Sequence, residues 1–543
     1  MLGLMQDHPL LISQLIDFAV RHHPRTEIVS RRLEGDIHRY TYVEAARRAK
    51  QVAGALDRLG IAVGECVGTL AWNGYRHFEL YFGVSGSGRV LHTLNPRLSP
   101  EQVTWILNDA EDQVLCFDAT FLPIVKAIAA HCPTVRRWVL MCEASALPAD
   151  TGINHLVSYE AWIAEEASDY EWPVFDERSA ASLCYTSGTT GNPKGVLYSH
   201  RSTMLHCYGG GLPDALNLSA RDVVLPVVPM FHVNAWGLPY IAPMVGAKLV
   251  FPGAALDGKS LYELMESEGV TMAAGVPTVW LGLLNHVQSV GGGFTHMRRT
   301  VIGGSACPPS MIAKFREYAV TVLHAWGMTE MSPLGTICNL KQSQLAESPQ
   351  RQLEIMAKQG RAVFGVDMKI VDAEGRELPW DGGSSGDLLV RGPWILSRYF
   401  KGAGGDPLID GWFPTGDVAS IDADGFMQIT DRSKDVIKSG GEWISSIDIE
   451  NIAMAHPAVA LAACIAAYHP KWDERPLLVV TKKPGAELSR NELLEFFAGR
   501  VVKWQVPDDV VFMDAIPLGA TGKVQKMKLR EQFRDYLSSR PAP

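Results

Sequence analysis

The sequence predicts an α/β protein with a large N-terminal domain and a small C-terminal α+β domain. Helix and strand patterns alternate over most of the chain, hairpin patterns follow from residue 418, and the charged segment 431–435 has no apolar face. Alternating helices and strands are typical of layers built on buried parallel strands. We therefore predict several subdomains with mostly parallel sheets in residues 1–430, a linker at 431–435 and a second domain in residues 436–543.

Local signals in the first part of the chain support the alternation. Apolar residues recur at helical spacing from Tyr42 to Leu59, where Gly60 ends the pattern. Ser99 and Gln102 form a capping box with proline between them, which predicts a helix from there to about Asn108. Short apolar runs predict strands at 65–71, 113–117, 137–142 and 181–185. We expect this alternation to continue to about residue 415.

The rest of the chain has a different pattern. Residues 418–430 read as a hairpin around the turn at 422–425. A helix is predicted after Ser446, and a later helix starts with Ser489 and Glu492 as its cap. Strands are predicted near 459–466 and at 477–481. This mixture indicates the small α+β domain.

Composition restricts the class of protein. The chain has 543 residues, is 47% hydrophobic and 20% charged, and carries a net charge of −9, so no basic stripe predicts binding to nucleic acid. Its nine cysteines are scattered without a CxxC pair, and its start lacks the features of a signal peptide. The most apolar stretch, 223–251, is interrupted by prolines and polar residues, which favours a pocket wall over a membrane span. We expect a cytoplasmic enzyme without a transmembrane segment.

The segment YTSGTTGNPKG, residues 185–195, is the most informative motif. Its glycines allow close approach of the backbone to an anion, its hydroxyls can donate to phosphate oxygens, and Lys194 adds positive charge. It follows a predicted buried strand, where phosphate-binding loops of α/β proteins lie. It is not a Walker loop, because Gly195 replaces the hydroxyl residue that would hold magnesium. A flexible surface turn is the alternative.

Further motifs follow the loop in a fixed order. They are PMFH (229–232), GGSA (303–306), WGMTE (326–330), GDLLVRGP (386–393), GWFPTGD (411–417), the segment 431–444 and GATGK (519–523). Together they resemble the adenylate-forming superfamily, which contains acyl-CoA synthetases, firefly-type luciferases and peptide-synthetase adenylation domains. The resemblance covers nearly the whole chain. It implies an ATP-dependent acyl-CoA ligase that converts a carboxylic acid, ATP and coenzyme A to acyl-CoA, AMP and pyrophosphate through an acyl-adenylate.

The resemblance also implies roles for individual residues. Thr186 and Glu330 would hold the Mg²⁺ that accompanies ATP, and Asp417 with Arg432 would bind the ribose. Lys523 would reach from the small domain to the carboxylate and the α-phosphate, and the candidate catalytic residues are Lys523, Glu330, Thr186 and His232. The other residues expected to contact the nucleotide are Ser187, Gly188, Thr189, Thr190, Lys194, Gly304, Ser305, Ala306, Trp326, Gly327, Met328 and Thr329. Of these, Gly304, Ser305, Ala306 and Trp326 resemble an adenine slot, although the family more often has tyrosine at the last position.

In the family, the small domain is mobile and rotates about a hinge at the position of Lys434. A second face then approaches the site and admits the thiol of coenzyme A; here it would comprise Lys438, Gly440, Gly441, Glu442 and Trp443. Two half-reactions that need different groups around one carbon explain such a switch. Read alone, Lys523 in its glycine-rich turn is an exposed surface lysine, accessible to acetylation.

The segment FHVNAW, residues 231–236, indicates which class of acid the protein uses. It and the segment KSGGEWIS, 438–445, resemble bacterial medium- and long-chain fatty acyl-CoA synthetases, in which the tryptophan gates an acyl tunnel. Methylmercaptopropionate-CoA ligases share the pattern with a short substrate, so chain length stays open. The expected pocket comprises His232, Val233, Trp236, Gly303 and Gly304. Long-chain members are homodimers, which makes a homodimer the expected assembly.

Other classes of protein make different demands on the sequence. A luciferase-type monooxygenase would share the adenylation motifs, while an amino-acid adenylation domain would carry an aspartate after the FHVNAW segment, which this stretch lacks. A non-catalytic binding protein would be expected to lose Lys523, Glu330 or Asp417, and all three are present. A packed core histidine and a core tryptophan are the alternatives for His232 and Trp236.

Overall fold

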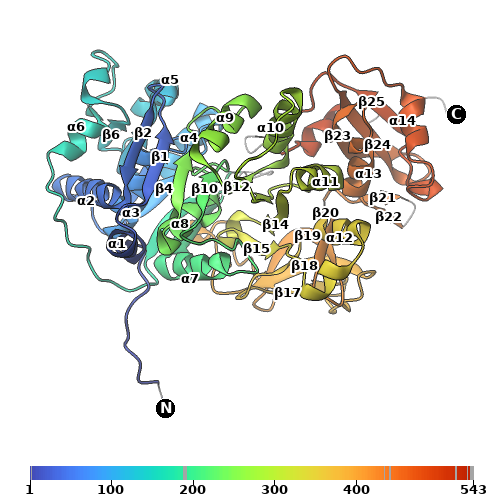
Figure 1. The fold of residues 1–543 in the computed structure, drawn as a ribbon, viewed down its shortest axis with the longest axis horizontal. Coiled ribbons are helices and arrows are strands. Elements are labelled where there is room, and N and C mark those ends of the chain that lie inside the picture. The colour runs from blue at the N-terminus through green and yellow to red at the C-terminus, as the bar shows by residue number, and fades with distance from the viewer. Residues whose placement is uncertain are drawn as a thin grey trace.

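A computed structural model describes residues 1, 3–186, 192–432, 434–439, 442–519, 523–534, 536 and 537, with only the backbone described for Glu442 and Trp443. The small C-terminal part lies at one end of the molecule, beyond α10 (Pro277–Ser289) and α11 (Pro309–Glu317) (Figure 1). Six residues expected at the site lie outside the described part, namely Ser187, Gly188, Thr189, Thr190, Gly440 and Gly441.

A seven-stranded sheet forms the first layer of the large domain. Its strand order is β7-β6-β5-β3-β4-β8-β9, and all neighbours are parallel except the β8–β9 pair. The strands are β3 (Cys66–Leu70), β4 (Val90–Thr93), β5 (Val114–Phe117), β6 (Arg137–Leu140), β7 (Leu156–Ser158), β8 (Ala180–Tyr185) and β9 (Gly195–Ser199). Associated helices are α3 (Tyr75–Gly86), α4 (Pro100–Ala110), α5 (Leu122–Ile128), α6 (Tyr159–Ala164) and α7 (His200–Gly211).

A nine-stranded sheet forms the second layer, in the order β16-β15-β14-β13-β12-β10-β11-β1-β2. Its six central strands are parallel, and β2, β15 and β16 run antiparallel to their neighbours. The strands are β1 (Glu27–Arg31), β2 (Ile37–Thr41), β10 (Val223–Pro226), β11 (Lys248–Phe251), β12 (Met272–Gly275), β13 (Arg299–Ile302), β14 (Thr321–Gly327), β15 (Leu334–Ile337) and β16 (Arg361–Ala362). Its helices, besides α10 and α11, are α1 (Ser13–His22), α2 (Tyr42–Arg58), α8 (Leu238–Val245), α9 (Gly258–Glu268) and α12 (Pro349–Met356).

The two sheets share one hydrophobic core, to which residues of both layers contribute. The stretch 223–251 is part of this core, as predicted: it contains β10, α8 and β11, and most of its apolar side chains are buried. No helix in the described ranges is both long and apolar enough to cross a membrane.

The predicted alternation ends earlier than expected. Beyond β14, the strands pair antiparallel, and residues 367–432 form a four-stranded antiparallel sheet in the order β17-β18-β19-β20. Its strands are β17 (Asp367–Val371), β18 (Ser385–Arg391), β19 (Phe413–Ile421) and β20 (Met427–Arg432). The prediction of alternation to residue 415 was therefore wrong by about ninety residues, because these partly exposed strands lack the continuous apolar runs of buried parallel ones. The β19–β20 pair confirms the predicted hairpin.

The small domain has one sheet, β22-β21-β24-β23 with β25 added to β24. The strands are β21 (Ile437–Ser439), β22 (Glu442–Ile444), β23 (Val459–His469), β24 (Asp473–Lys482) and β25 (Asp509–Phe512), and the helices are α13 (Ser446–Met454), α14 (Arg490–Phe496) and α15 (Lys526–Gln532). The capping boxes at Ser99–Gln102 and Ser489–Glu492 are both present. Such boxes depend on four consecutive residues, which is why sequence alone predicts them.

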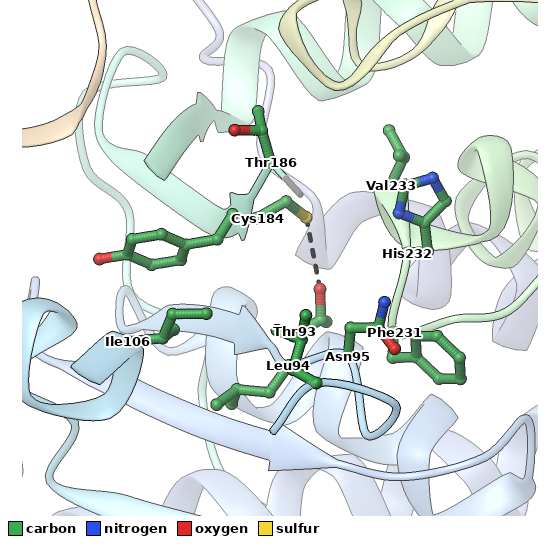
Figure 2. Close-up of a pocket in the computed structure, with 11 residues that line it drawn as sticks. Thr93, Leu94, Asn95, Ile106, Cys184, Thr186, Phe231, His232 and Val233 are labelled. Atoms are coloured by element: carbon green, nitrogen blue, oxygen red, sulfur yellow. Dashed lines mark hydrogen bonds between the residues drawn. The ribbon is translucent and has the colours of Figure 1, made fainter. Parts of the chain in front are cut away.

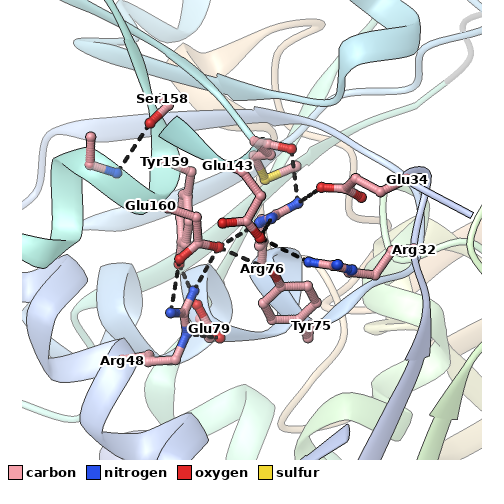
Figure 3. Close-up of polar contacts among 12 residues, drawn as sticks. Arg32, Glu34, Arg48, Tyr75, Arg76, Glu79, Glu143, Ser158, Tyr159 and Glu160 are labelled. Atoms are coloured by element: carbon pink, nitrogen blue, oxygen red, sulfur yellow. Dashed lines mark hydrogen bonds and ion pairs between the residues drawn. The ribbon is translucent and has the colours of Figure 1, made fainter. Parts of the chain in front are cut away.

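A network of charges fixes α3 inside the large domain. Every residue of α3 is buried, and Glu79 is fully so, accepting a 2.7 Å hydrogen bond from Arg48 of α2. Arg76, also on α3, donates to Glu160 at 2.7 Å and pairs with Glu34 and Glu143 (Figure 3). Removing one partner of a buried ion pair costs about 3–5 kcal/mol, so these contacts set the position of α3.

Candidate active site

Polar residues from distant parts of the chain meet at one edge of the nine-stranded sheet. His232 follows β10, Gly303 and Gly304 follow β13, and Glu330 follows β14. Because the carboxyl ends of parallel strands share one edge, these residues gather there. The antiparallel sheet adds Asp417 from β19. Strand order thus explains most of this cluster.

Lys523 enters the cluster from the small domain. A methyl group built onto Gly304 would lie 3.9 Å from the Cε of Lys523. Burial, with Arg432 as a second cause, lowers the pKa of Lys523 to about 8, while Asp417 and Glu330 oppose the shift. The structure therefore contains the small domain in the orientation that brings this lysine to the site. The expectation of an exposed surface lysine was wrong for this orientation, because Lys523 is only partly accessible.

Asp417 is held by an aromatic side chain. Trp326 donates its indole N–H to Oδ2 of Asp417 at 2.9 Å, and the Nε of Arg432 lies 3.6 Å from Oδ1. The carboxylate is 6% exposed, and burial raises its pKa although Arg432, Trp326 and Lys523 counteract this. A carboxylate oxygen can accept more than one hydrogen bond, so Asp417 retains acceptor capacity. Sequence reasoning did not predict this bond.

Glu330 is oriented by a residue that the sequence analysis missed. The hydroxyl of Tyr399 donates to Oε1 of Glu330 at 2.9 Å, and the N–H of Leu396 donates to the backbone oxygen of Glu330 at 2.8 Å. Burial raises the pKa of Glu330. The ring of Tyr399 also lies under the ammonium group of Lys194, 4.8 Å from its centroid. Tyr399 lies six residues beyond the GDLLVRGP motif, and no local pattern marks it.

The two ends of the glycine-rich loop are joined directly. The N–H of Thr186 donates to the oxygen of Lys194 at 2.9 Å, and the N–H of Lys194 donates to Oγ1 of Thr186 at 3.3 Å. The loop connects the antiparallel strands β8 and β9. It therefore leads into a strand, which agrees with the conclusion that it is not a Walker loop.

The WGMTE segment is fixed by backbone contacts. A methyl group on Gly327 would lie 2.0 Å from the oxygen of Pro333, so only glycine fits there. The N–H of Met328 donates to the same oxygen at 3.1 Å, and Tyr198 donates to the oxygen of Thr329 at 2.6 Å. These contacts fix the direction of the chain just before Glu330.

A small cavity is lined by two of the five residues expected at the acid pocket, His232 and Val233. This cavity of about 20 Å³, room for about one water molecule, is bounded by Thr93, Cys184, Thr186, Phe231, His232 and Val233 (Figure 2). Burial lowers the pKa of His232 to about 3, with Lys523 and Arg97 contributing, so its imidazole is neutral near pH 7. A methyl group on Gly303 would lie 3.3 Å from the indole of Trp236, which places that ring against the glycine pair.

Four other expected residues form no hydrogen bond or ion pair with the cluster among the described residues, namely Ser305, Ala306, Lys434 and Lys438. Lys438 is exposed on β21 and donates its backbone N–H to Glu474. Burial lowers the pKa of Lys434, whose backbone oxygen accepts a 2.7 Å hydrogen bond from Arg530. Ala306 borders a larger cavity, of about 660 Å³, between the two domains.

The residues around Glu330 fit a magnesium ion. Magnesium prefers oxygen ligands and takes only one or two protein carboxylates when it accompanies a nucleotide. Glu330 would supply a buried carboxylate with one oxygen oriented by Tyr399. Thr186, which is hydrogen-bonded to Lys194 next to the ring of Tyr399, would supply a hydroxyl. No group of three or more His, Cys, Asp or Glu side chains that could hold a metal ion occurs in the described ranges.

Comparison with known proteins identifies the family. The model of the AMP-binding enzyme family matches residues 16–400, and that of the AMP-binding enzyme C-terminal domain matches residues 448–523. The chain belongs to the AMP-binding enzyme family.

Relatives of known activity cover almost the entire chain. It is 55% identical to a 3-methylmercaptopropionyl-CoA ligase of Ruegeria lacuscaerulensis, over 99% of this chain and 100% of that protein. It is 51% identical to a medium-chain-fatty-acid–CoA ligase of Ectopseudomonas oleovorans, over 99% and 98%. The crystal structure of the anthranilate CoA ligase AuaEII in complex with anthranoyl-AMP matches with a TM-score of 0.87 and 25% identity, over 98% of this chain and all of the other.

Proposed function

We propose that the protein is an ATP-dependent acyl-CoA ligase that forms an acyl-adenylate and then transfers the acyl group to coenzyme A. One observation carries the proposal: Lys523 of the small domain lies at Gly304, within electrostatic reach of Asp417 and Glu330. An ammonium group next to carboxylates that suit a ribose and a magnesium-bound nucleotide is the arrangement that adenylate formation needs. The CoA ligases among its relatives support the same reaction.

In the first half-reaction, a carboxylate oxygen attacks the α-phosphorus of ATP, and the bond to pyrophosphate breaks. Charged Lys523 neutralises the negative charge that builds up between the acid and the α-phosphate, and Asp417 accepts hydrogen bonds from the ribose. Glu330 and Thr186 would hold Mg²⁺, which supplies further positive charge to the phosphates. The adenine slot would comprise Gly304, Ser305, Ala306 and Trp326.

In the second half-reaction, the thiol sulfur of coenzyme A attacks the acyl carbon, the bond to AMP breaks and the thiol proton is released. This step requires the small domain to rotate about residues 431–435. Three features support that hinge: β20 ends at Arg432, β21 of the small sheet starts at Ile437, and Lys438 is exposed in the present orientation. After rotation, Lys438, Gly440, Gly441, Glu442 and Trp443 would surround the thiol.

The proposed acid is a medium- to long-chain fatty acid. The cavity beside His232 holds about 20 Å³, so a chain of several carbons requires side chains to move. The indole of Trp236, which lies against Gly303 outside the lining of this cavity, is the side chain that we assign to this movement. A second candidate is 3-methylmercaptopropionate, favoured by a relative at 55% identity. This short thioether acid has the length of pentanoate, with sulfur in place of one methylene.

The test measures pyrophosphate release with and without coenzyme A for acids from propionate to palmitate, together with 3-methylmercaptopropionate. A fatty-acid enzyme should gain about fourfold in specificity constant per buried methylene, until the pocket ends. A thioether-specific enzyme should prefer 3-methylmercaptopropionate over pentanoate and lose activity with longer acids. Release of pyrophosphate without any acyl-CoA product would overturn the ligase assignment.

We further propose a homodimer in the cytoplasm. The nine cysteines all lie in described parts of the chain, and each is buried with a free thiol, as expected in a reducing compartment. Sedimentation velocity would test the assembly, and a single species of 59.5 kDa would exclude the dimer.

A further inference from the structure

The segment that carries Trp236 has an unusual backbone. Val233, Asn234, Ala235 and Trp236 have φ angles of 46°, 51°, 48° and 58°, and Gly237 follows at 79°. Residues other than glycine rarely adopt this left-handed backbone conformation, and a β-branched residue such as Val233 is a genuine outlier there. Five such residues in succession form a left-handed turn, which persists only if its surroundings hold it. We call residues 233–237 the left-handed turn.

Asn234 supplies the central contacts of the left-handed turn. It is 4% exposed, and its side-chain NH₂ donates to Oγ of Ser182 at 2.9 Å. Its Oδ1 accepts from the hydroxyl of Tyr81 at 3.3 Å and from the thiol of Cys184 at 3.6 Å. Asparagine also tolerates left-handed angles better than most residues do. Both the conformation and the hydrogen bonds therefore depend on this side chain.

Tyr81 joins the turn to the rigid part of the large domain. Its single hydroxyl proton is shared between the oxygen of Met230 at 2.6 Å and Oδ1 of Asn234 at 3.3 Å, so Tyr81 contacts both sides of His232 along the chain. Tyr81 lies on α3, the helix fixed by the charge network of Figure 3. Asn73, just before α3, accepts from the N–H of Met230 at 2.6 Å and donates to the oxygens of Pro226 and Val228.

The left-handed turn places the indole of Trp236 against Gly303 and Gly304. Methyl groups built onto these glycines would lie 3.3 Å and 3.9 Å from the ring, and the one on Gly304 also 3.9 Å from Lys523. The indole thus lies where the bound acid passes from its carboxylate to its chain. Its position depends on the backbone of the turn, because four successive left-handed residues determine the direction in which Trp236 projects.

We propose that Asn234 and Tyr81 are positioning residues that determine acyl-chain selectivity by holding the left-handed turn that presents Trp236. The proposal rests on the proposed acyl-CoA ligase function and on Trp236 lining its acid pocket. Asn234 and Tyr81 act through Trp236, and loss of their contacts lets the turn relax towards right-handed or extended angles. The indole then leaves the glycine pair, and the size of the accepted acid changes while nucleotide binding does not.

The experiment compares two tyrosines in full-length protein. Tyr81→Phe removes the hydroxyl that contacts the turn, and Tyr42→Phe removes a hydroxyl that donates to the oxygen of Ala247 at 2.7 Å. Both tyrosines are fully buried, so the two variants should lose similar thermal stability. Specificity constants for butanoate, hexanoate, octanoate and decanoate, and the KM for ATP, are measured for each variant and for Trp236→Ala.

Tyr81→Phe should change the octanoate-to-butanoate ratio by about fivefold, the effect of one lost buried hydrogen bond, with the KM for ATP unchanged. Tyr42→Phe should leave the ratio at the wild-type value. Asn234→Gly keeps the left-handed angles and loses only the hydrogen bonds of the side chain, whereas Asn234→Ala loses both. The octanoate-to-butanoate ratio should therefore change more in Asn234→Ala than in Asn234→Gly.

Three results would overturn the inference, and they differ in their consequences for the proposed function. If Trp236→Ala changes the ratio while Tyr81→Phe and Asn234→Gly do not, the positioning role is wrong and the pocket assignment stands. If Trp236→Ala also leaves the ratio unchanged, Trp236 does not line the acid pocket, and this part of the proposed function is wrong as well. Equal changes in Tyr81→Phe and Tyr42→Phe would assign the effect to lost stability.

Discussion

The lowered pKa of Lys523 predicts how adenylate formation depends on pH. The side chain is held near Arg432 in a buried site, and its pKa of about 8 lies below the value of 10.5 for a solvated lysine. This difference corresponds to about 3 kcal/mol, because one pKa unit equals about 1.4 kcal/mol. That energy opposes entry of the charged lysine into the site, and ATP phosphates are expected to offset it.

The direction of the effect follows from proton binding. Below pH 8 the amine is charged in both orientations of the small domain, and the closed orientation carries the full cost of burying it. Between pH 8 and 10.5 the amine releases its proton on closing, so closure becomes more favourable as the pH rises. The charge that adenylation needs is lost over the same range. We therefore expect the specificity constant for ATP to fall above pH 8, about tenfold by pH 9.

The assay is pyrophosphate release at saturating acid and low ATP from pH 6.5 to 10. Lys523→Ala should lose about 100- to 1,000-fold in adenylation, the effect of removing one group that stabilises transition-state charge. It should largely retain transfer from a synthetic acyl-adenylate to coenzyme A. Arg432→Gln removes a charge that lowers the pKa, so its activity should fall at higher pH than that of the wild type. A wild-type profile that is flat to pH 10, or an unchanged midpoint in Arg432→Gln, would refute this reasoning.

Three other predictions concern the hinge, the metal and modification. Lys434→Pro restricts φ at the proposed pivot, so adenylation should survive and thioester formation should collapse; normal overall turnover would exclude the pivot. Tyr399→Phe removes the hydrogen bond to Glu330 and should raise the Mg²⁺ concentration for half-maximal activity about tenfold, and an unchanged Mg²⁺ titration would contradict this. A non-hydrolysable acyl-adenylate analogue should protect Lys523, but not exposed Lys438, from chemical acetylation measured by peptide mass spectrometry; equal labelling with and without the analogue would show that Lys523 stays accessible.

Sequence predicted the local elements well where a few adjacent residues determine them. The capping boxes at Ser99 and Ser489, the helix from Tyr42 and the β19–β20 hairpin are all present. It overestimated the alternating region because the strands of the antiparallel sheet are partly exposed and lack continuous apolar runs. Propensity alone does not distinguish such strands from connecting segments.

Site residues that belong to local motifs could be predicted from the sequence, and those that depend on distant contacts could not. Glu330, Asp417 and Lys523 lie in motifs that can be found along the chain, and the structure brings them together. Tyr399 contacts Glu330 across a separation of 69 positions in the sequence, and Tyr81 contacts Met230 across 149 positions. No rule of sequence spacing identifies contacts over such separations. The accessibility of Lys523 depends on how two domains meet, which no local pattern encodes.

The interface between the domains has the properties that a rotating domain needs. In the present orientation Lys523 lies at Gly304 while Lys438 is exposed on β21, so the proposed role of Lys438 needs a second orientation. Contacts at the pivot among the described residues include hydrogen bonds from Ser445 to the oxygen of Thr430 and from Ser446 to Asp431. Arg530 pairs with Asp435 and donates to the oxygen of Lys434. Beyond the pivot, a cavity of about 660 Å³ separates Ala306 and Gln428 of the large domain from Ile444, Asp448 and Arg500 of the small one. Close packing there would have to be broken in every catalytic cycle, whereas an open interface keeps the two orientations close in free energy, and substrates can then select between them.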